Sequence, residues 1–181
     1  MMSLTNFNRV IMIGWLLTLI ACSVTSIPAT SNSRVKLQHA YQLMSDGKSL
    51  EAQKLIGEVL KVSEQVGDVM MVAQTYAVYG DLYKLGKTQD ALKLPDFKQA
   101  AISYQKAAEN YQIMRHFLTE SIFLWTTGIM HSNAGDKDLA CDCFDEALKV
   151  FRLDSIDRNN IKAPEALPER IGFEQKKVGC I

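Results

Sequence analysis

The sequence predicts an all-α fold of three stacked antiparallel helical hairpins between residues 33 and 154. Ala, Leu, Gln, Lys and Glu dominate this region, and apolar residues recur at three- and four-residue spacing, which is typical of helices with one buried face. Gly47, Gly86 and Gly135 each end such a segment, and glycine suits a helix C-terminus where the backbone turns left-handed. The expected helices are at about 33–45, 48–65, 68–85, 96–114, 117–133 and 137–152.

One set of spacings occurs three times along this region. The middle copy has its glycine one residue early and an insertion within KTQDALKLP. A repeat at this scale indicates similar units that stack on one another. The copies are Ala40, Leu43, Gly47, Ala52, Ile56 and Val59; Gly80, Tyr83, Gly86, Ala100, Tyr104 and Ala107; and Gly128, His131, Gly135, Ala140, Phe144 and Ala147.

The spacing has a packing reason. A small residue in the first helix of each hairpin lets the second helix approach closely, a facing alanine keeps the contact small, and a larger side chain fills the space beside them. A single hairpin cannot bury its apolar face alone, so the hairpins must stack. The three sets are Ala40, Ala52 and Ile56; Gly80, Ala100 and Tyr104; and Gly128, Ala140 and Phe144.

The segment AGDKDLACDCFDEALKVF resembles the tetratricopeptide repeat, and GKSLEAQKLIGEVL and DFKQAAISYQKAAENY resemble it more weakly. Copies 40 and 48 residues apart exceed the 34 of that family. Lys36 and His39 replace large apolar residues, and the prolines that commonly end repeats are absent. The resemblance implies a TPR-like α-solenoid in which the first helix of each hairpin lines a concave protein-binding surface.

By that resemblance, a partner-binding groove follows the exposed positions of the first helices. Trp125 is the expected anchor, because aromatic side chains dominate interface energies; the alternative is that it packs against the C-terminal segment. Polar groove residues could pair with a peptide or could simply be solvated. The expected groove positions are Arg34, Leu37, Tyr41, Met44, Ser45, Gln74, Ala77, Asp81, Lys84, Ile122, Trp125, Ile129, Ser132 and Asn133.

The N-terminus has the pattern of an export signal: Arg9, then an apolar run from Val10 to Ile20, then Ala21 and Cys22. It resembles a bacterial lipoprotein signal, which implies that residues 1–21 are removed and that Cys22 is acylated. The run is shorter than the ~20 residues of a transmembrane helix; plain cleavage or a retained anchor are the alternatives. Residues 22–32 would be a lipidated tether. Ser23 in place of Asp favours, by resemblance, the outer membrane facing the periplasm, with the cell exterior as the alternative.

Three further cysteines and the C-terminal segment, residues 155–181, remain. In the oxidising compartment that export implies, a disulfide Cys141–Cys180 or Cys143–Cys180 could form; otherwise the cysteines are small buried apolar residues. Leu167 to Val178 could form a capping helix over the last hairpin. The alternative is a disordered tail.

Charge and motifs point to binding, with no catalytic signature. Without residues 1–21 the chain loses Arg9 from 20 basic residues and keeps 20 acidic ones, a net charge of −1, which does not suit nucleic acid. We find no nucleotide loop, metal motif or cofactor site, and His39, His116 and His131 are widely spaced.

The expected function is therefore a membrane-tethered protein-binding scaffold of the bacterial envelope, serving pilus, secretion or cell-wall machinery as such lipoproteins do. Two alternatives are open. One is a structural homo-oligomer whose groove is filled by the tail. The other is a thiol enzyme that uses Cys141 or Cys143 with His131.

Overall fold

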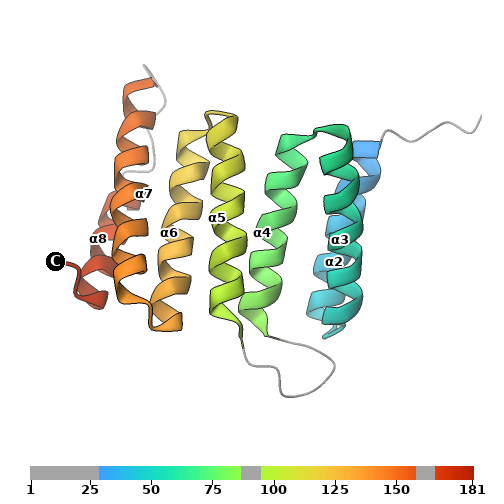
Figure 1. Cartoon of the computed structure of the whole chain (residues 1–181), viewed down its shortest axis with the longest axis horizontal. Helices are drawn as coiled ribbons and strands as arrows, with labels where there is room; N and C mark the ends of the chain where they lie inside the picture. Colours follow the sequence, from blue (N-terminus) through green and yellow to red (C-terminus); the bar gives the residue numbers. More distant parts are fainter. Residues whose placement is uncertain (1–28, 87–94, 158–165) are drawn as a thin grey trace, which may run out of the picture.

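The computed structural model describes residues 29–86, 95–157 and 166–181. These residues form seven α-helices and no strand, so the prediction of an all-α stack is confirmed (Figure 1). Cys22, the signal segment and residues 87–94 of the insertion lie outside the described residues. The helices are α2 (Ala29–Ser45), α3 (Ser49–Val66), α4 (Val69–Leu85), α5 (Phe97–Ile113), α6 (Phe117–Ala134), α7 (Lys137–Asp157) and α8 (Ala166–Val178).

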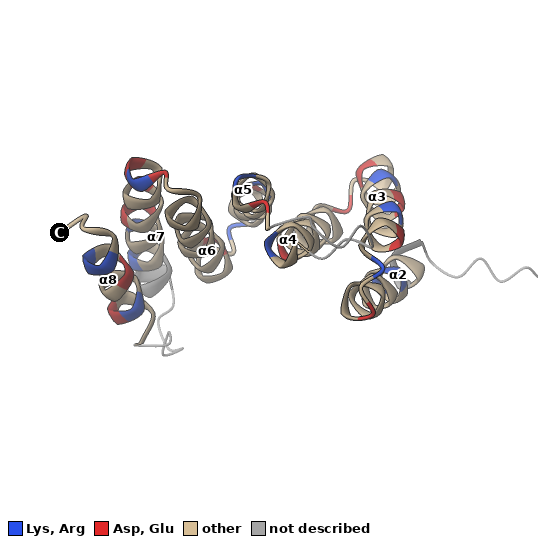
Figure 2. Cartoon of the chain, turned by 90° about the horizontal axis from the view of Figure 1, so that it is seen from below, with Lys and Arg blue, Asp and Glu red and all other residues tan. Residues whose placement is uncertain are grey.

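The helices are arranged in two rows. Figure 2, which looks along the helices, shows α2, α4, α6 and α8 in one row and α3, α5 and α7 in the other. Each helix packs against the next along the chain, as antiparallel hairpins require. The first row bends, with α2 and α8 displaced from α4 and α6 away from the second row. This row therefore forms the concave side of the molecule.

The helix boundaries follow the predicted ones closely except at the start of α2 and at the end of α7, which continues to Asp157 although the prediction ends that helix at about 152 and the repeat domain at 154. α2 begins at Ala29, so residues 29–32 belong to a helix and not to the predicted tether. The first turn of a helix leaves its N–H groups without intrahelical partners, so a polar sequence is tolerated there. Only residues 23–28 then separate Cys22 from the first helix.

The small-to-large contacts inside the hairpins are confirmed at both glycines. A Cβ on Gly128 would lie 2.6 Å from the Phe144 ring, and one on Gly80 would lie 2.5 Å from the Tyr104 ring. Ala40 and Ile56 occupy the same places in the first hairpin and are fully buried. The aromatic rings therefore pack directly against backbone that carries no side chain.

The turns contain one departure from the glycine pattern. Gly67 and Gly135 have φ angles of 70° and 84° where α3 and α6 end, but Arg115 takes the corresponding place after α5 with φ 56°. A side chain in the left-handed region costs about 1 kcal/mol. The fold thus has an arginine at a position where glycine would have the lower backbone energy.

The C-terminal segment is a docked helix. Leu167 and Ile171 of α8 are buried in one cluster with Phe144 and Val150 of α7. A disulfide joins Cys141 to Cys180, with the Cα atoms 5.6 Å apart. Of the two disulfides predicted as alternatives, this is the one present, and the capping helix replaces the disordered tail.

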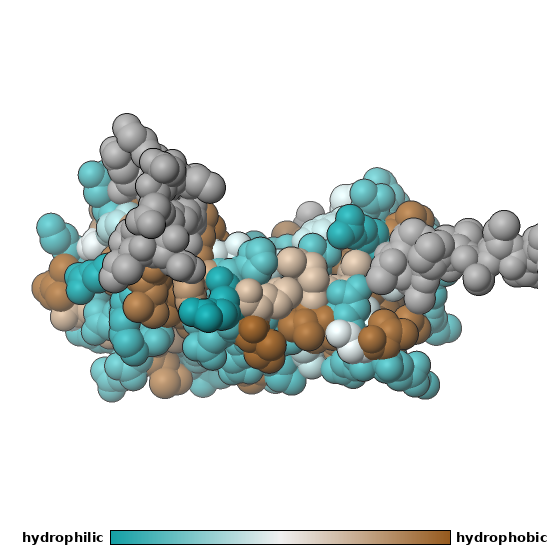
Figure 3. All heavy atoms as spheres, turned by 90° about the horizontal axis from the view of Figure 1, so that it is seen from above, coloured by the Kyte–Doolittle hydropathy of each residue, from teal (hydrophilic) through white to brown (hydrophobic). Residues whose placement is uncertain are grey.

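The ends of the helices form two edges of the stack. The upper edge, drawn at the top of Figure 1, consists of the turns at residues 66–70 and 113–118 together with the start of α2. The lower edge consists of the turns at residues 45–49 and 134–138. Figure 3 looks onto the upper edge and shows apolar residues, in brown, gathered along it among polar ones.

Candidate protein-binding groove

A hollow of about 460 Å³ lies on the concave side. α2 forms one wall, α4 forms the base, and one aromatic residue each from α5 and α6 completes the lining. Arg34 and Gln38 are exposed at its rim, whereas Leu37 and Val78 are buried in its wall. The lining residues are Arg34, Leu37, Gln38, Tyr41, Gln74, Ala77, Val78, Tyr111 and Phe123.

Two aromatic residues of the lining, Tyr111 and Phe123, belong to a stack of three rings whose third member, Tyr104, does not line the hollow. The Tyr111 and Phe123 rings are nearly parallel, with an interplanar angle of 9° and centroids 5.4 Å apart. On its other side Phe123 stacks on Tyr104, with centroids 6.1 Å apart. Stacked rings of this kind have few accessible rotamers, so the groove presents a rigid apolar surface.

Asp81 joins three neighbouring side chains beside the hollow. Tyr41 Oη donates to Asp81 Oδ2 over 2.9 Å, and Tyr104 Oη donates to Oδ1 over 2.6 Å. Lys84 Nζ lies 3.0 Å from the same Oδ1. Burial, and then the Asp81 carboxylate, raise the pKa of both tyrosines well above the usual range, so both phenols stay protonated donors. Asp81 thereby ties α2 and α5 to α4.

The structure brings together only part of the predicted groove. Tyr41 and Gln74 line the hollow as expected. Asp81 and Lys84 lie next to it, but their charged groups are used by the hydrogen bonds and the ion pair that join them to each other and to Tyr104. Met44 was expected to be exposed, and this is wrong: it is 2% exposed and packs in the core between the first hairpin and α4, because it faces the same side of α2 as Leu37 and Ala40.

The predicted groove positions of α6 lie away from the hollow. Trp125 and Ile129 are half-buried and pack into the cluster that contains Leu167 and Ile171 of α8. Trp125 Nε1 is buried without a hydrogen-bond partner among the described residues. Trp125 thus follows the alternative expectation, packing against the C-terminal segment, and does not line the hollow. Asn133 is exposed at the other end of α6.

Four groove residues were missed by the reasoning from sequence, and one of them is Val78, a buried residue of α4. Tyr111 lies on the second helix of a hairpin, which the resemblance excludes from the concave surface. Phe123 recurs at helical spacing, which is typical of core residues, and Gln38 lies between Leu37 and Tyr41 with no pattern of its own. The bend of the first row lets Tyr111 line the same hollow as α2, and the spacing of residues in the sequence does not predict this bend.

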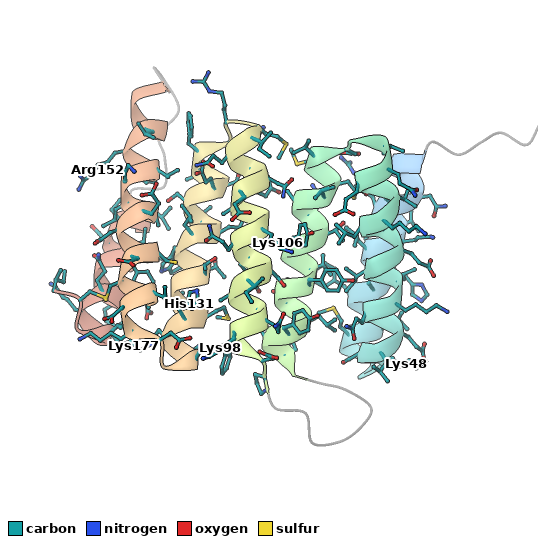
Figure 4. All side chains as sticks on the ribbon, in the orientation of Figure 1. Lys48, Lys98, Lys106, His131, Arg152 and Lys177 are labelled. Carbon is teal, nitrogen blue, oxygen red and sulfur yellow. A yellow bond between two sulfur atoms is a disulfide. The ribbon has the colours of Figure 1, made fainter. Side chains whose placement is uncertain are left out.

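The environments of Cys141, Cys143 and His131 do not favour a reactive thiol. Cys141 is in the disulfide. Burial, together with the neighbouring Asp142, raises the pKa of the Cys143 thiol to about 11, so it is protonated at neutral pH. His131 is half-buried near the lower end of α6, with Nδ1 3.8 Å from Asp136 Oδ2 (Figure 4). These contacts weigh against a Cys–His nucleophile, which needs a thiolate.

Metal and membrane features were sought in the same residues. In the parts of the chain that the structure describes, no group of three or more His, Cys, Asp and Glu could hold a metal ion. Among the helices α2 to α8, none has the length and apolar character needed to span a bilayer.

The chain matches none of the protein families, curated proteins or solved structures with which it was compared.

Proposed function

We propose that this chain is a lipid-anchored scaffold of the bacterial cell envelope that binds a protein or peptide in its concave groove. The observation that carries the proposal is the hollow beside α2 and α4, with its rigid aromatic stack and its polar rim. Fixed aromatic surfaces flanked by polar groups are typical of protein-binding sites, since rigid rings lose little entropy on binding.

The lining indicates the chemistry of the ligand. Leu37, Val78 and Phe123 offer an apolar contact to one or two side chains of the partner. The Gln38 and Gln74 amides can donate to and accept from a peptide backbone, and Arg34 adds one cation. A short segment with an apolar residue and a nearby carboxylate fits this lining.

The anchoring half of the proposal comes from the sequence at Cys22. A basic residue, a short apolar run and a small residue before cysteine resemble a lipoprotein signal. The described domain supports it indirectly, because the Cys141–Cys180 disulfide suits the oxidising compartment that export implies. Binding would then take place close to a membrane.

The groove is tested by photocrosslinking in the intact envelope. A photoreactive amino acid replaces Gln38 at the groove rim, and in a matched control it replaces Lys54, an exposed residue of α3. We expect a crosslinked partner band from position 38 and none from position 54.

A second variant makes the result specific. Ala77→Arg places a long charged side chain into the hollow and should abolish the band from position 38 without lowering the amount of protein. If both positions gave the same bands, or if Ala77→Arg left the band unchanged, the groove would not be the binding site. A band of twice the chain mass would identify a second copy as the occupant.

A further inference from the structure

The two edges of the stack differ in the turns that form them. On the upper edge the turns have the sequences VGDVMM and IMRHFL; on the lower edge they have SDGKS and AGDKD. A turn that only connects two helices is usually polar, because it lies in water. The upper turns carry far more apolar surface than a connection requires.

This apolar surface is open. Ile113 is 70% exposed and Val66 is 58% exposed. Val69, Met70 and Met114 lie in the same two turns and are half-buried. On the lower edge Leu50 and Leu139 are also about half exposed, but each is isolated in a turn of charged residues. Figure 3 shows brown apolar residues on the upper edge, in patches separated by polar ones.

Two charged groups of the upper edge, Asp68 and Arg115, are already engaged within the fold. The Asp68 carboxylate accepts the Met71 N–H and is used as a helix cap. Arg115 is exposed, with its guanidinium carbon 5.9 Å from the Phe117 ring centroid. An arginine beside apolar groups can lay its stem along them and direct its guanidinium to phosphate. Glu64 is exposed two residues before Val66, and together with Asp68 it outweighs the positive charge of Arg115, so attraction of this edge to lipid rests on apolar contact.

The chain outside the structure ends at this same edge. α2 begins at Ala29 on the upper edge, and Cys22 precedes it by seven residues. Seven residues span at most about 25 Å. The helices are about as long, at 1.5 Å per residue over 17 or 18 residues. An anchor at Cys22 reaches the level of the lower edge only if this segment runs fully extended along the whole stack, so every shorter path places the upper edge nearer the bilayer.

From these observations we propose that the upper edge is a lipid-docking surface. Ile113, Val66 and Met114 enter the interfacial layer of the bilayer that carries the Cys22 anchor, and Arg115 contacts lipid phosphate. The proposal rests on the proposed lipidation, because the anchor supplies the high local concentration that makes shallow apolar contacts effective. The groove, on the concave side of the stack, stays free for its ligand.

Lipid quenching of tryptophan tests the proposal with a matched pair of variants. Full-length Ile113→Trp and Leu139→Trp are each exported, purified in detergent and reconstituted into phosphatidylethanolamine–phosphatidylglycerol vesicles brominated near the headgroup end of the acyl chains. The native Trp125 gives the same background in both. We expect the tryptophan at 113 to lose most of its fluorescence and the one at 139 to lose almost none.

Each outcome has one meaning. Quenching at 113 alone, lessened by Arg115→Gly or by Val66→Ser, supports docking of the upper edge. Vesicle-bound protein with equal or no quenching at both positions overturns it while leaving the anchor intact. Failure of the wild-type chain to stay with the vesicles refutes the lipidation and, with it, this inference. Absent quenching together with crosslinks between copies assigns the edge to a homo-oligomer and contradicts lipid docking.

Discussion

At the scale of single residues, Glu120 is a buried carboxylate with incomplete hydrogen bonding. It is 3% exposed in the first turn of α6; Oε1 accepts a hydrogen bond from Gln112 Nε2 over 3.1 Å, and Oε2 has no hydrogen-bond partner among the described residues. Burial raises the pKa of this carboxyl, a shift that the hydrogen bond from Gln112 opposes only in part. The charged form of Glu120 therefore lowers the free energy of unfolding at neutral pH.

Replacing this carboxylate gives a pH-dependent prediction. Since the folded pKa lies above the unfolded one, the folded state binds the proton more tightly, and stability falls as the pH rises through the raised pKa. Glu120→Gln should increase the free energy of unfolding by about 1 kcal/mol at neutral pH, and the gain should shrink as the pH falls toward 4.5, the ordinary carboxyl value. Urea unfolding at the two pH values measures it, with exposed Glu64→Gln as control. A gain that grows at low pH would contradict burial of the charged carboxylate as the cause.

At the scale of helices, the close contact between α6 and α7 depends on a missing Cβ. Gly128→Ala would place that atom 2.6 Å from the Phe144 ring and 3.1 Å from the Ala140 carbonyl oxygen. We expect a loss of about 2 kcal/mol in the free energy of unfolding. Gly172→Ala in α8, with no atom within 4 Å of the added Cβ, is the matched control and should be neutral or stabilising. Equal effects in denaturant unfolding would show that helix propensity, and not packing, decides.

The docking of α8 gives a second prediction at this scale. The Cys141–Cys180 bond spans 39 residues, and removing it with Cys180→Ser should cost about 3 kcal/mol. Leu167, Ile171 and the 2.7 Å Gln175–Asp145 hydrogen bond remain, but the covalent tie at the end of α8 is lost. We therefore expect α8 to open locally and more often while the other helices stay folded. Limited trypsin digestion should then cut at Lys176 or Arg170 first. Cys143→Ser, which touches no disulfide, should leave the digestion pattern unchanged.

The helices and their contacts could be predicted from the sequence, whereas the groove could be predicted only in part. The helices and their small-to-large contacts follow from Gly80, Gly128 and the periodic alanines, because local spacing sets which side of a helix is buried. The groove was predicted only in part: Tyr41 and Gln74 line it, but Met44 is core and Trp125 packs against the cluster that includes Leu167 and Ile171 of α8. Which exposed stripe remains open depends on the bend of the row and on where α8 docks, and neither is encoded in the spacing of one hairpin.

At the scale of the whole molecule, location is a separate property from fold. Cys22→Ser should abolish acylation and move the chain from the membrane to the soluble envelope fraction, while its thermal unfolding stays the same because residue 22 lies ahead of α2. Metabolic labelling with palmitate followed by membrane fractionation measures both effects. Ser23→Thr serves as a control beside the cysteine. Retention of unlabelled Cys22→Ser protein on the membrane would mean that something other than the lipid holds it there.

α2 combines two mechanical roles in this chain. It is the wall of the groove, held to α4 by the Tyr41–Asp81 hydrogen bond, and it is also the helix that directly follows the segment with Cys22. If that cysteine is anchored, tension between a bound partner and the membrane passes along α2 and loads the Tyr41–Asp81 bond. The affinity of the groove for its partner would then depend on force. Tyr41→Phe, which removes this hydrogen bond, would weaken the complex more under tension than without it.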